Sequence, residues 1–300
     1  MCENHNPLGM LRRSTGVRLL VLFTSFFFLL LVAAGIGAVL MEVPAINGRT
    51  AVLLTSVVQC LLAFCVPAWL TARFSSGHPL KFLGLASSPG IRAYIGVVIV
   101  YVLALPAMNQ LIIWNEQIHF PEWAAGIEAT LREWERANGE VSELALSASG
   151  FWQMIAGVCV IGVLTGFSEE VFFRGTMQSI FSDSGVGKGV AVWGAAAIFS
   201  AVHFQFFGFF PRLLMGAFFG YLLVWTGSIW PSVFAHALNN SIVVVSALIC
   251  GEGSGDPVGN IGATTDGSLP WAAVFSLAAT ALFFFHFRNT LFKRVPQSTI

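Results

Sequence analysis

Long apolar runs alternate with short polar links along most of the chain. Several runs reach the roughly twenty residues that a helix needs to cross a hydrocarbon core of about 30 Å. Because these runs carry few charges, we predict an all-α membrane protein with about eight transmembrane helices. The predicted spans cover residues 19–41, 51–72, 93–114, 151 to the polar turn at 182, 190–204, 213–225, 231–250 and 269–287.

The first run, 19–41, is too long for the apolar part of a signal peptide, and no convincing cleavage site follows it, so we predict a retained span. Eight spans place both termini on one side of the membrane. That side then holds most of the lysines and arginines, which makes it cytoplasmic by the positive-inside rule. We expect a multi-pass protein of the cell membrane (the inner or plasma membrane).

Residues 115–150 form the only long polar stretch of the sequence. Its middle has apolar residues at near-helical spacing, Pro121 suits the first turn of a helix, and Gly139 suits the end of one. We expect an amphipathic helix on the outer surface. The chain then divides into three spans plus this stretch (1–150), a core of four helices (151–250), and an outer loop with the last span and a basic inner tail (251–300).

Composition agrees with a membrane protein, since 56% of the residues are hydrophobic and only 10% are charged. Soluble domains carry roughly 25% charged residues. The net charge is zero, so nothing suggests a nucleic-acid partner; the lipid bilayer is the expected one. The five cysteines have neither metal-ligand nor disulfide spacing and are interpreted as small buried hydrophobes.

Ionisable side chains within the apolar runs are the exception that points to function. Glu169, Glu170 and Arg174 follow the run that begins at 151, although a carboxylate in a bilayer costs at least about 2.5 kcal/mol. The fifth run contains Phe199 and His203, four residues apart. The seventh contains His236 and Asn240, also four apart and therefore on one helix face. In contrast, the GxxxG pair Gly216 and Gly220 of the sixth run is expected to serve close helix packing.

Spacing suggests separate roles for the two glutamates. Glu170 and Arg174 have the favourable order for an ion pair on a helix, whereas Glu169 is rotated by about 100° and lacks a neighbouring cation. In an antiparallel hairpin around Gly185, Glu169 and His203 lie within about 3 Å of the same height. We hypothesise that Glu169, assisted by His203, takes a proton from water. His236 and Asn240 would then donate hydrogen bonds to the oxyanion during peptide-bond hydrolysis.

Three motifs, EExxxR, FxxxH and HxxxN, occur in that order on separate predicted helices. They resemble the CPBP intramembrane proteases, also called the Abi family, which include CAAX-processing endopeptidases and bacteriocin-processing or immunity proteins. The resemblance covers roughly residues 151–246. It implies a CAAX-endopeptidase-like helical bundle, catalytic residues Glu169, His203, His236 and Asn240, no cofactor, and a membrane-associated protein or peptide as substrate. Glu170, Arg174 and Phe199 would support the site.

Other interpretations remain open. The same family has been described as metalloproteases, and zinc could be held by Glu169, Glu170, His203 and His236. A non-enzymatic immunity or scaffold protein could bind a peptide in the same cavity, and a transporter could also use buried Glu and His. The GxGD sequence at 253–256 is interpreted as a coincidence.

One geometric difficulty concerns the two histidines. Strict alternation of spans places His203 towards the outer face and His236 towards the inner face. They can meet only if the spans tilt or if the nearly uncharged link 205–212 turns below the membrane surface. We predict that this link dips into the membrane.

Overall fold

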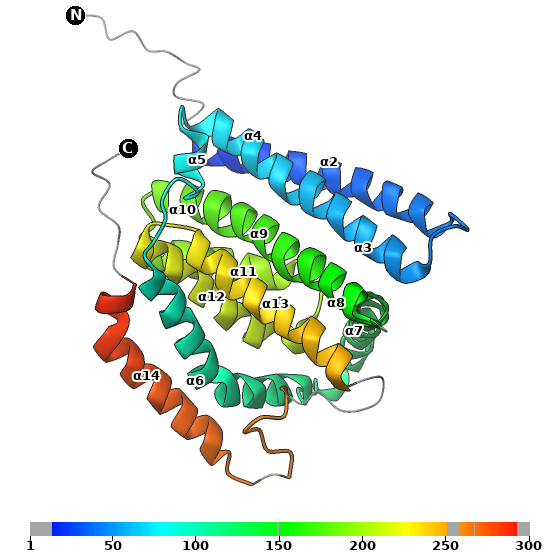
Figure 1. Cartoon of the computed structure of the whole chain (residues 1–300), viewed down its shortest axis with the longest axis vertical. Helices are drawn as coiled ribbons and strands as arrows, with labels where there is room; N and C mark the ends of the chain where they lie inside the picture. Colours follow the sequence, from blue (N-terminus) through cyan, green and yellow to red (C-terminus); the bar gives the residue numbers. More distant parts are fainter. Residues whose placement is uncertain (1–13, 149, 251–257, 267, 293–300) are drawn as a thin grey trace, which may run out of the picture.

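The computed structural model describes residues 14–148, 150–250, 258–266 and 268–292. Within these ranges the chain is helical and contains no strand, as predicted for an all-α membrane protein (Figure 1). The GxGD sequence and the basic tail after residue 292 lie outside the described residues.

The N-terminal helices form one outer layer of the bundle, at the top of Figure 1. The layer comprises α2 (Thr15–Met41), α3 (Gly48–Gln59), the π-helical turn η1 (Cys60–Cys65) and α4 (Val66–Ser75). Asn47 caps α3 by accepting a hydrogen bond from the Thr50 amide at 2.8 Å. At the other end of the layer, Arg18 pairs with Asp183 of α10 (Ser179–Asp183) at 2.8 Å. This ion pair fixes α2 to the central helix.

The opposite edge is formed by α6 (Ile91–Glu116) and α14 (Trp271–Leu291), which pack side by side (Figure 1). Pro106 lies inside α6, and the hydroxyl of Ser276 on α14 contacts the backbone beside it. It accepts from the Ala107 amide at 3.2 Å and donates to the Leu103 carbonyl at 2.5 Å. A serine from the neighbouring helix thus bonds a backbone amide and a carbonyl beside the proline. The short α5 (Pro79–Phe82) precedes α6.

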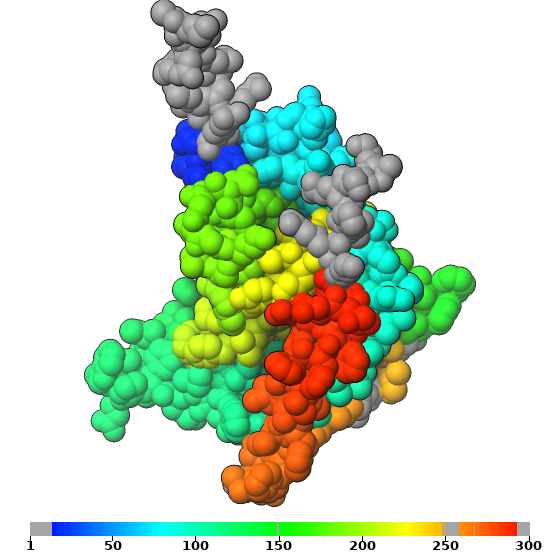
Figure 2. Space-filling model, turned by 90° about the vertical axis from the view of Figure 1, so that its left-hand side faces the viewer, coloured from blue at the N-terminus to red at the C-terminus, as the bar shows by residue number. Residues whose placement is uncertain are grey.

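The predicted amphipathic helix is present as η2 (Glu122–Ala124) followed by α7 (Ala125–Leu146). In Figure 2 this segment stands out at the lower left. The helix continues through Gly139 to Leu146, so the predicted end at Gly139 is wrong. Glycine is only weakly unfavourable inside a helix, and the neighbouring helix formers carry the helix past it.

The polar residues of the first motif lie on one long central helix. It runs through α8 (Phe151–Gly157), η3 (Val158–Leu164), α9 (Thr165–Glu170), η4 (Val171–Gln178) and α10 (Ser179–Asp183). The segments η3 and η4 are π-helical and flank the two glutamates. Such widened turns occur mostly as short insertions in α-helices and often at functional sites.

Three further helices complete the core. They are α11 (Lys188–Ala201), α12 (Phe209–Thr226), preceded by the 3-10 turn η5 (Phe206–Gly208), and α13 (Trp230–Cys250). In Figure 1 they lie between the central helix and the α6–α14 edge. Behind the glutamates, the aromatic rings of Phe64, Phe172, Phe173 and Phe199 form a chain of contacts that joins the outer layer to α11.

Six helices in the described part of the chain are long and apolar enough to cross a membrane. They cover 15–41, 48–75, 91–116, 151–183, 206–226 and 271–291. Of the other two predicted spans, α13 has 21 residues but α11 has only 14, or about 21 Å. The total of eight full spans stays a prediction, because α11 is shorter than a hydrocarbon core of about 30 Å.

Candidate active site

A buried ion pair forms the fixed base of the site. Arg174 Nη1 donates to Glu170 Oε1 at 2.8 Å, and neither side chain has exposed area. Arg174 Nη2 donates to the Gly216 carbonyl of α12 at 2.9 Å. The pair expected from the i, i+4 spacing is therefore present, and it also ties the central helix to α12.

His236 extends this pair from α13. Its Nδ1 lies 2.8 Å from Glu170 Oε1, the same oxygen that accepts from Arg174. Since that carboxylate is an acceptor, Nδ1 carries the proton and donates it. The other ring nitrogen, Nε2, lies 3.7 Å from Glu169 Oε2. Glu170 therefore orients the imidazole so that Nε2 faces the second glutamate.

Glu169 differs from Glu170 in its exposure and in its hydrogen bonding. Its side chain is 12% exposed, whereas that of Glu170 is fully buried. It forms no hydrogen bond to any described residue, and Arg174 is bonded to its neighbour instead. The adjacent carboxylates thus have different tasks available: Glu170 is engaged by two cationic or donor groups, and Glu169 is available to a reactant.

His203 reaches the site from a turn, which corrects the predicted fifth span of 190–204. Helix α11 ends at Ala201, and Phe204 adopts the left-handed conformation with a φ of 52°. A non-glycine residue with this φ cannot continue a right-handed helix. His203 therefore projects from the end of α11 and the turn after it.

The Phe199 side chain links the two histidines. Its ring lies 4.9 Å from the His203 ring and 5.8 Å from the His236 ring, between centroids. Nδ1 of His203 donates to the Phe199 carbonyl at 2.7 Å, which leaves Nε2 of the neutral ring as an acceptor. The Arg174 guanidinium also lies over the Phe199 ring, at 4.4 Å. Residues from all three motifs thus meet at one phenyl ring.

Asn240 is close to the central helix but is already partly engaged. Its Nδ2 donates to the Ile161 carbonyl at 3.2 Å, and its Oδ1 accepts from Asn239 at 3.2 Å. A carboxamide has two N–H groups, so one stays available for a reactant. The bond to Ile161 was not predicted.

Glycines allow the helices to approach closely enough to build this site. A Cβ on Gly166 would lie 3.0 Å from the Ala237 backbone nitrogen, so α9 and α13 meet at the glutamates. A Cβ on Gly216 would lie 3.0 Å from Arg174 Nη2, and one on Gly220 would lie 2.6 Å from Gln178 Oε1. The packing role predicted for the GxxxG pair is confirmed. In addition, the close approach makes two backbone carbonyls available as acceptors.

Two neighbours of the site were missed in the sequence. Gln178 lies four residues after Arg174 and donates to the Gly220 carbonyl at 3.0 Å, which repeats the Arg174–Gly216 contact one turn later. Helical spacing could have revealed it. Phe219 stacks on the His236 ring at 5.1 Å. Its sequence position gave no signal, because it is one of many phenylalanines in an apolar run.

The link between α11 and α12 follows a short helix, and its dip into the membrane stays a prediction. The short α11 reaches about 21 Å, so the link begins before a full hydrocarbon core has been crossed. Helix α7 covers it: the Arg132 guanidinium lies 4.0 Å from the Phe207 ring, and the rings of Trp134 and Phe204 are 5.9 Å apart. Phe207 is buried, whereas Phe204 and Phe210 are exposed, so α7 covers only part of the link.

The four residues considered as zinc ligands do not form a metal-binding group. Among the described residues, no three His, Cys, Asp or Glu side chains are arranged to hold a metal ion. Glu170 Oε1 is bonded to a guanidinium, and His203 Nδ1 to a backbone carbonyl. Glu170 is therefore unavailable as a ligand, whereas a hydrogen-bonded Nδ1 leaves Nε2 of His203 open. The four-residue zinc set is not formed among the described residues.

Comparison with known proteins identifies the segment that carries these residues. Residues 151–242 match the family model described as "type II CAAX prenyl endopeptidase Rce1-like". No curated protein and no solved structure shows significant similarity to the chain. The matched segment contains all three motifs. Residues 151–242 are therefore similar to the Rce1-like CAAX endopeptidases, a family of peptidases.

Proposed function

We propose that this protein is an intramembrane endopeptidase that hydrolyses a peptide bond of a membrane-associated protein or peptide. The main support is the placement of His236 between two glutamates, of which Glu170 is hydrogen-bonded and Glu169 forms no hydrogen bond to a described residue. Glu170 orients the ring through Nδ1, and Glu169 lies 3.7 Å from Nε2. A base, an oriented imidazole and an enclosed position are the features that water activation requires.

In the proposed reaction, Glu169 takes a proton from water as the water oxygen bonds to the scissile carbonyl carbon. His203 Nε2, an acceptor in the neutral ring, holds the second hydrogen of that water. The tetrahedral intermediate then collapses, the carbon–nitrogen bond breaks, and Glu169 returns its proton to the leaving amine. Removing a general base of this kind lowers rates by about 10²–10⁴-fold.

His236 and Asn240 are proposed to stabilise the oxyanion. His236 Nε2 can donate only when the ring carries a proton on both nitrogens. Two carboxylates, one guanidinium and one imidazolium then give a cluster without net charge. This balance matters because an uncompensated charge in an apolar interior costs several kcal/mol. The remaining N–H of Asn240 would be the second donor.

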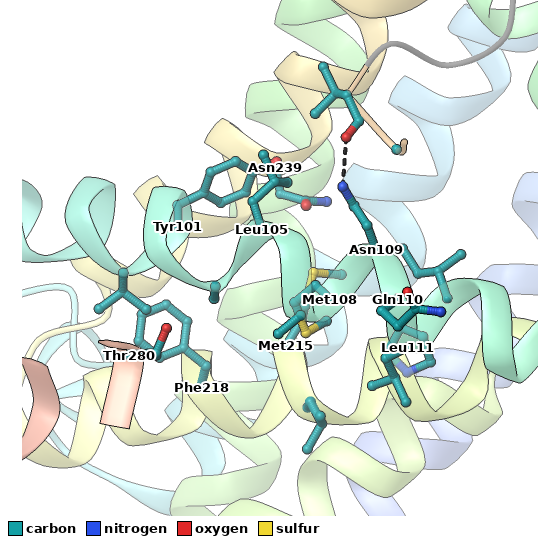
Figure 3. A pocket seen from close by; sticks show the side chains of 18 of the residues that line it. Tyr101, Leu105, Met108, Asn109, Gln110, Leu111, Met215, Phe218, Asn239 and Thr280 are labelled. Carbon is teal, nitrogen blue, oxygen red and sulfur yellow. Dashed lines mark hydrogen bonds between the residues drawn. The ribbon is translucent and has the colours of Figure 1, made fainter. Parts of the chain in front are cut away.

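A cavity of about 950 Å³ next to these residues supports an apolar substrate segment (Figure 3). It lies between α6, α12, α13 and α14, and its lining is mostly hydrophobic. Two of its lining residues contact the site: Phe219 stacks on His236, and Asn239 donates to Asn240. We propose that the cavity holds the membrane-embedded part of the substrate, either an apolar peptide segment or an attached lipid chain.

Cleavage of a peptide library by the purified protein in liposomes tests this function. The variants Glu169→Gln and His203→Ala should lose at least about 100-fold in kcat/KM. Glu133→Gln is the matched control, since Glu133 is exposed on α7, and it should cleave like the wild type. Peptide binding without cleavage by any form of the protein would instead support the immunity or scaffold role.

A further inference from the structure

The turn that carries His203 is held by residues outside the segment that matches the family model. Nδ1 of His203 bonds only to its own helix, through the Phe199 carbonyl. The following residue, Phe204, has a φ of 52°, a conformation that a bulky side chain adopts only when its surroundings enforce it. The geometry of His203 therefore depends on contacts made by the rest of the link.

Asn115, in the last turn of α6, supplies two of these contacts. Its Nδ2 donates to the Phe206 carbonyl at 3.2 Å, and its Oδ1 accepts from the Phe210 amide at 2.9 Å. The side chain is inside the protein, because only 2% of the residue is exposed. One carboxamide thus joins the start of the 3-10 turn to the first turn of α12, with its N–H group donating to one and its oxygen accepting from the other.

Glu135, on the amphipathic helix α7, supplies a third contact. Its Oε2 accepts from the Phe207 amide at 3.3 Å, within the same turn. On the same helix, the Arg132 guanidinium lies 4.0 Å from the Phe207 ring, and Trp134 contacts Phe204. Helix α7 thus contacts the backbone of the link at Phe207 and the side chains of Phe204 and Phe207.

We infer that Asn115 and Glu135 are positioning residues for His203. They fix the turn 204–210 and, through it, the imidazole beside Phe199 and His236. The amphipathic helix would then be part of the catalytic apparatus rather than a solvated cap. The inference rests on the proposed protease function for its kinetic readout, but the position of His203 can be measured without activity.

The kinetic test compares variants in liposomes with a cleaved peptide. Glu135→Ala is expected to lower kcat about 10-fold with KM changed less than twofold, because the turn loses an acceptor but the substrate cavity is untouched. Glu135→Gln should retain near-normal kcat, since its amide oxygen still accepts. Asn115→Asp should lower kcat by at least about 10-fold, because its carboxylate cannot donate to the Phe206 carbonyl. Glu133→Ala, on the same helix but exposed, is the control.

The structural test follows chemical modification of His203 by diethylpyrocarbonate, read by mass spectrometry. Glu135→Ala and Asn115→Asp should increase the modification rate severalfold while the thermal transition moves little, and Glu135→Gln should restore it. Wild-type modification rates and kcat in both of the damaging variants would overturn the inference. Altered modification of His203 in a protein that cleaves no peptide would support the positioning role while contradicting the protease function.

Discussion

The outer helices and the core helices use apolar and polar residues in opposite ways. On α2 and α14 the large apolar side chains face outwards: Leu31 is 74% exposed and Phe285 is 84% exposed. In the central helix the buried positions include ionised and amide side chains, with Glu170, Arg174 and Gln178 at most 1% exposed. Lipid solvates the first group, whereas the second must find partners inside the protein.

This difference separates two ways of being stable in a membrane. An outward phenylalanine exchanges one apolar neighbour for another, so its exact identity has little effect. A buried arginine or glutamate depends on a specific donor or acceptor at a specific distance, and its loss leaves another charge unpaired. The polar core is therefore where substitutions should have large effects and where chemistry is possible.

The largest effect is expected from breaking the buried ion pair. Arg174→Met should destabilise the protein by about 3–5 kcal/mol, because Glu170 would remain buried without its guanidinium partner. The double variant Glu170→Gln/Arg174→Met should recover much of this loss. Phe285→Leu on α14, the control from the lipid-facing group, should stay within about 0.5 kcal/mol of the wild type. Denaturation in detergent micelles measures all three, and equal losses at both sites would contradict the comparison.

A smaller loss of stability is expected from a glycine substitution where two helix backbones are in close contact. Gly166→Ala would place a methyl group 3.0 Å from the Ala237 backbone nitrogen, which cannot move aside like a flexible side chain. We expect a loss of about 1–3 kcal/mol, measured as a lower thermal transition. Gly126→Ala on α7 is the matched control: no atom lies within 4 Å of the added methyl, so this variant should be neutral or more stable. A harmless Gly166→Ala would show that the two helices can separate.

On the amphipathic helix α7, the contribution of Glu128 to stability is expected to depend on pH. Hydrogen bonds from the Phe120 amide, which has the larger effect, and from Arg132 lower the pKa of Glu128 to about 2. The ordinary glutamate pKa is about 4.3, so the contribution of Glu128 to stability is fully present above that value. It is lost as the pH falls through the folded-state pKa near 2.

Amide exchange at Phe120, compared between the wild type and Glu128→Gln at each pH, checks this expectation. The wild type should have the more protected amide at pH 5, and the difference should shrink as the pH approaches 2. A constant difference between the two proteins over this range would show that the carboxylate does not titrate as described.

The smallest effect is expected from metal removal. Because the described site residues do not form a metal-holding group, incubation with EDTA or 1,10-phenanthroline should change peptide cleavage less than twofold. Loss of cleavage, restored by added zinc, would mean that these side chains rearrange into a ligand set when the substrate or the metal binds.

The sequence by itself determined the membrane class, most of the helices and the identity of the polar groups. Apolar runs of about 20 residues and the rare charges within them can both be read directly along the chain. It also predicted the Glu170–Arg174 pair, which needs only helical spacing. The left-handed residue Phe204, which follows His203, could not be predicted, since Asn115 and Glu135 contact the adjoining residues from distant parts of the sequence.

Tertiary structure also decided which partner each polar group takes. His236 Nδ1 is bonded to Glu170 rather than left for a reactant, and Asn240 donates to the Ile161 carbonyl. These choices depend on how closely α13 approaches the central helix at Gly166, a distance that no spacing along one helix can specify. Local periodicity fixes which face a side chain occupies, but only the packing of separate helices fixes what lies opposite.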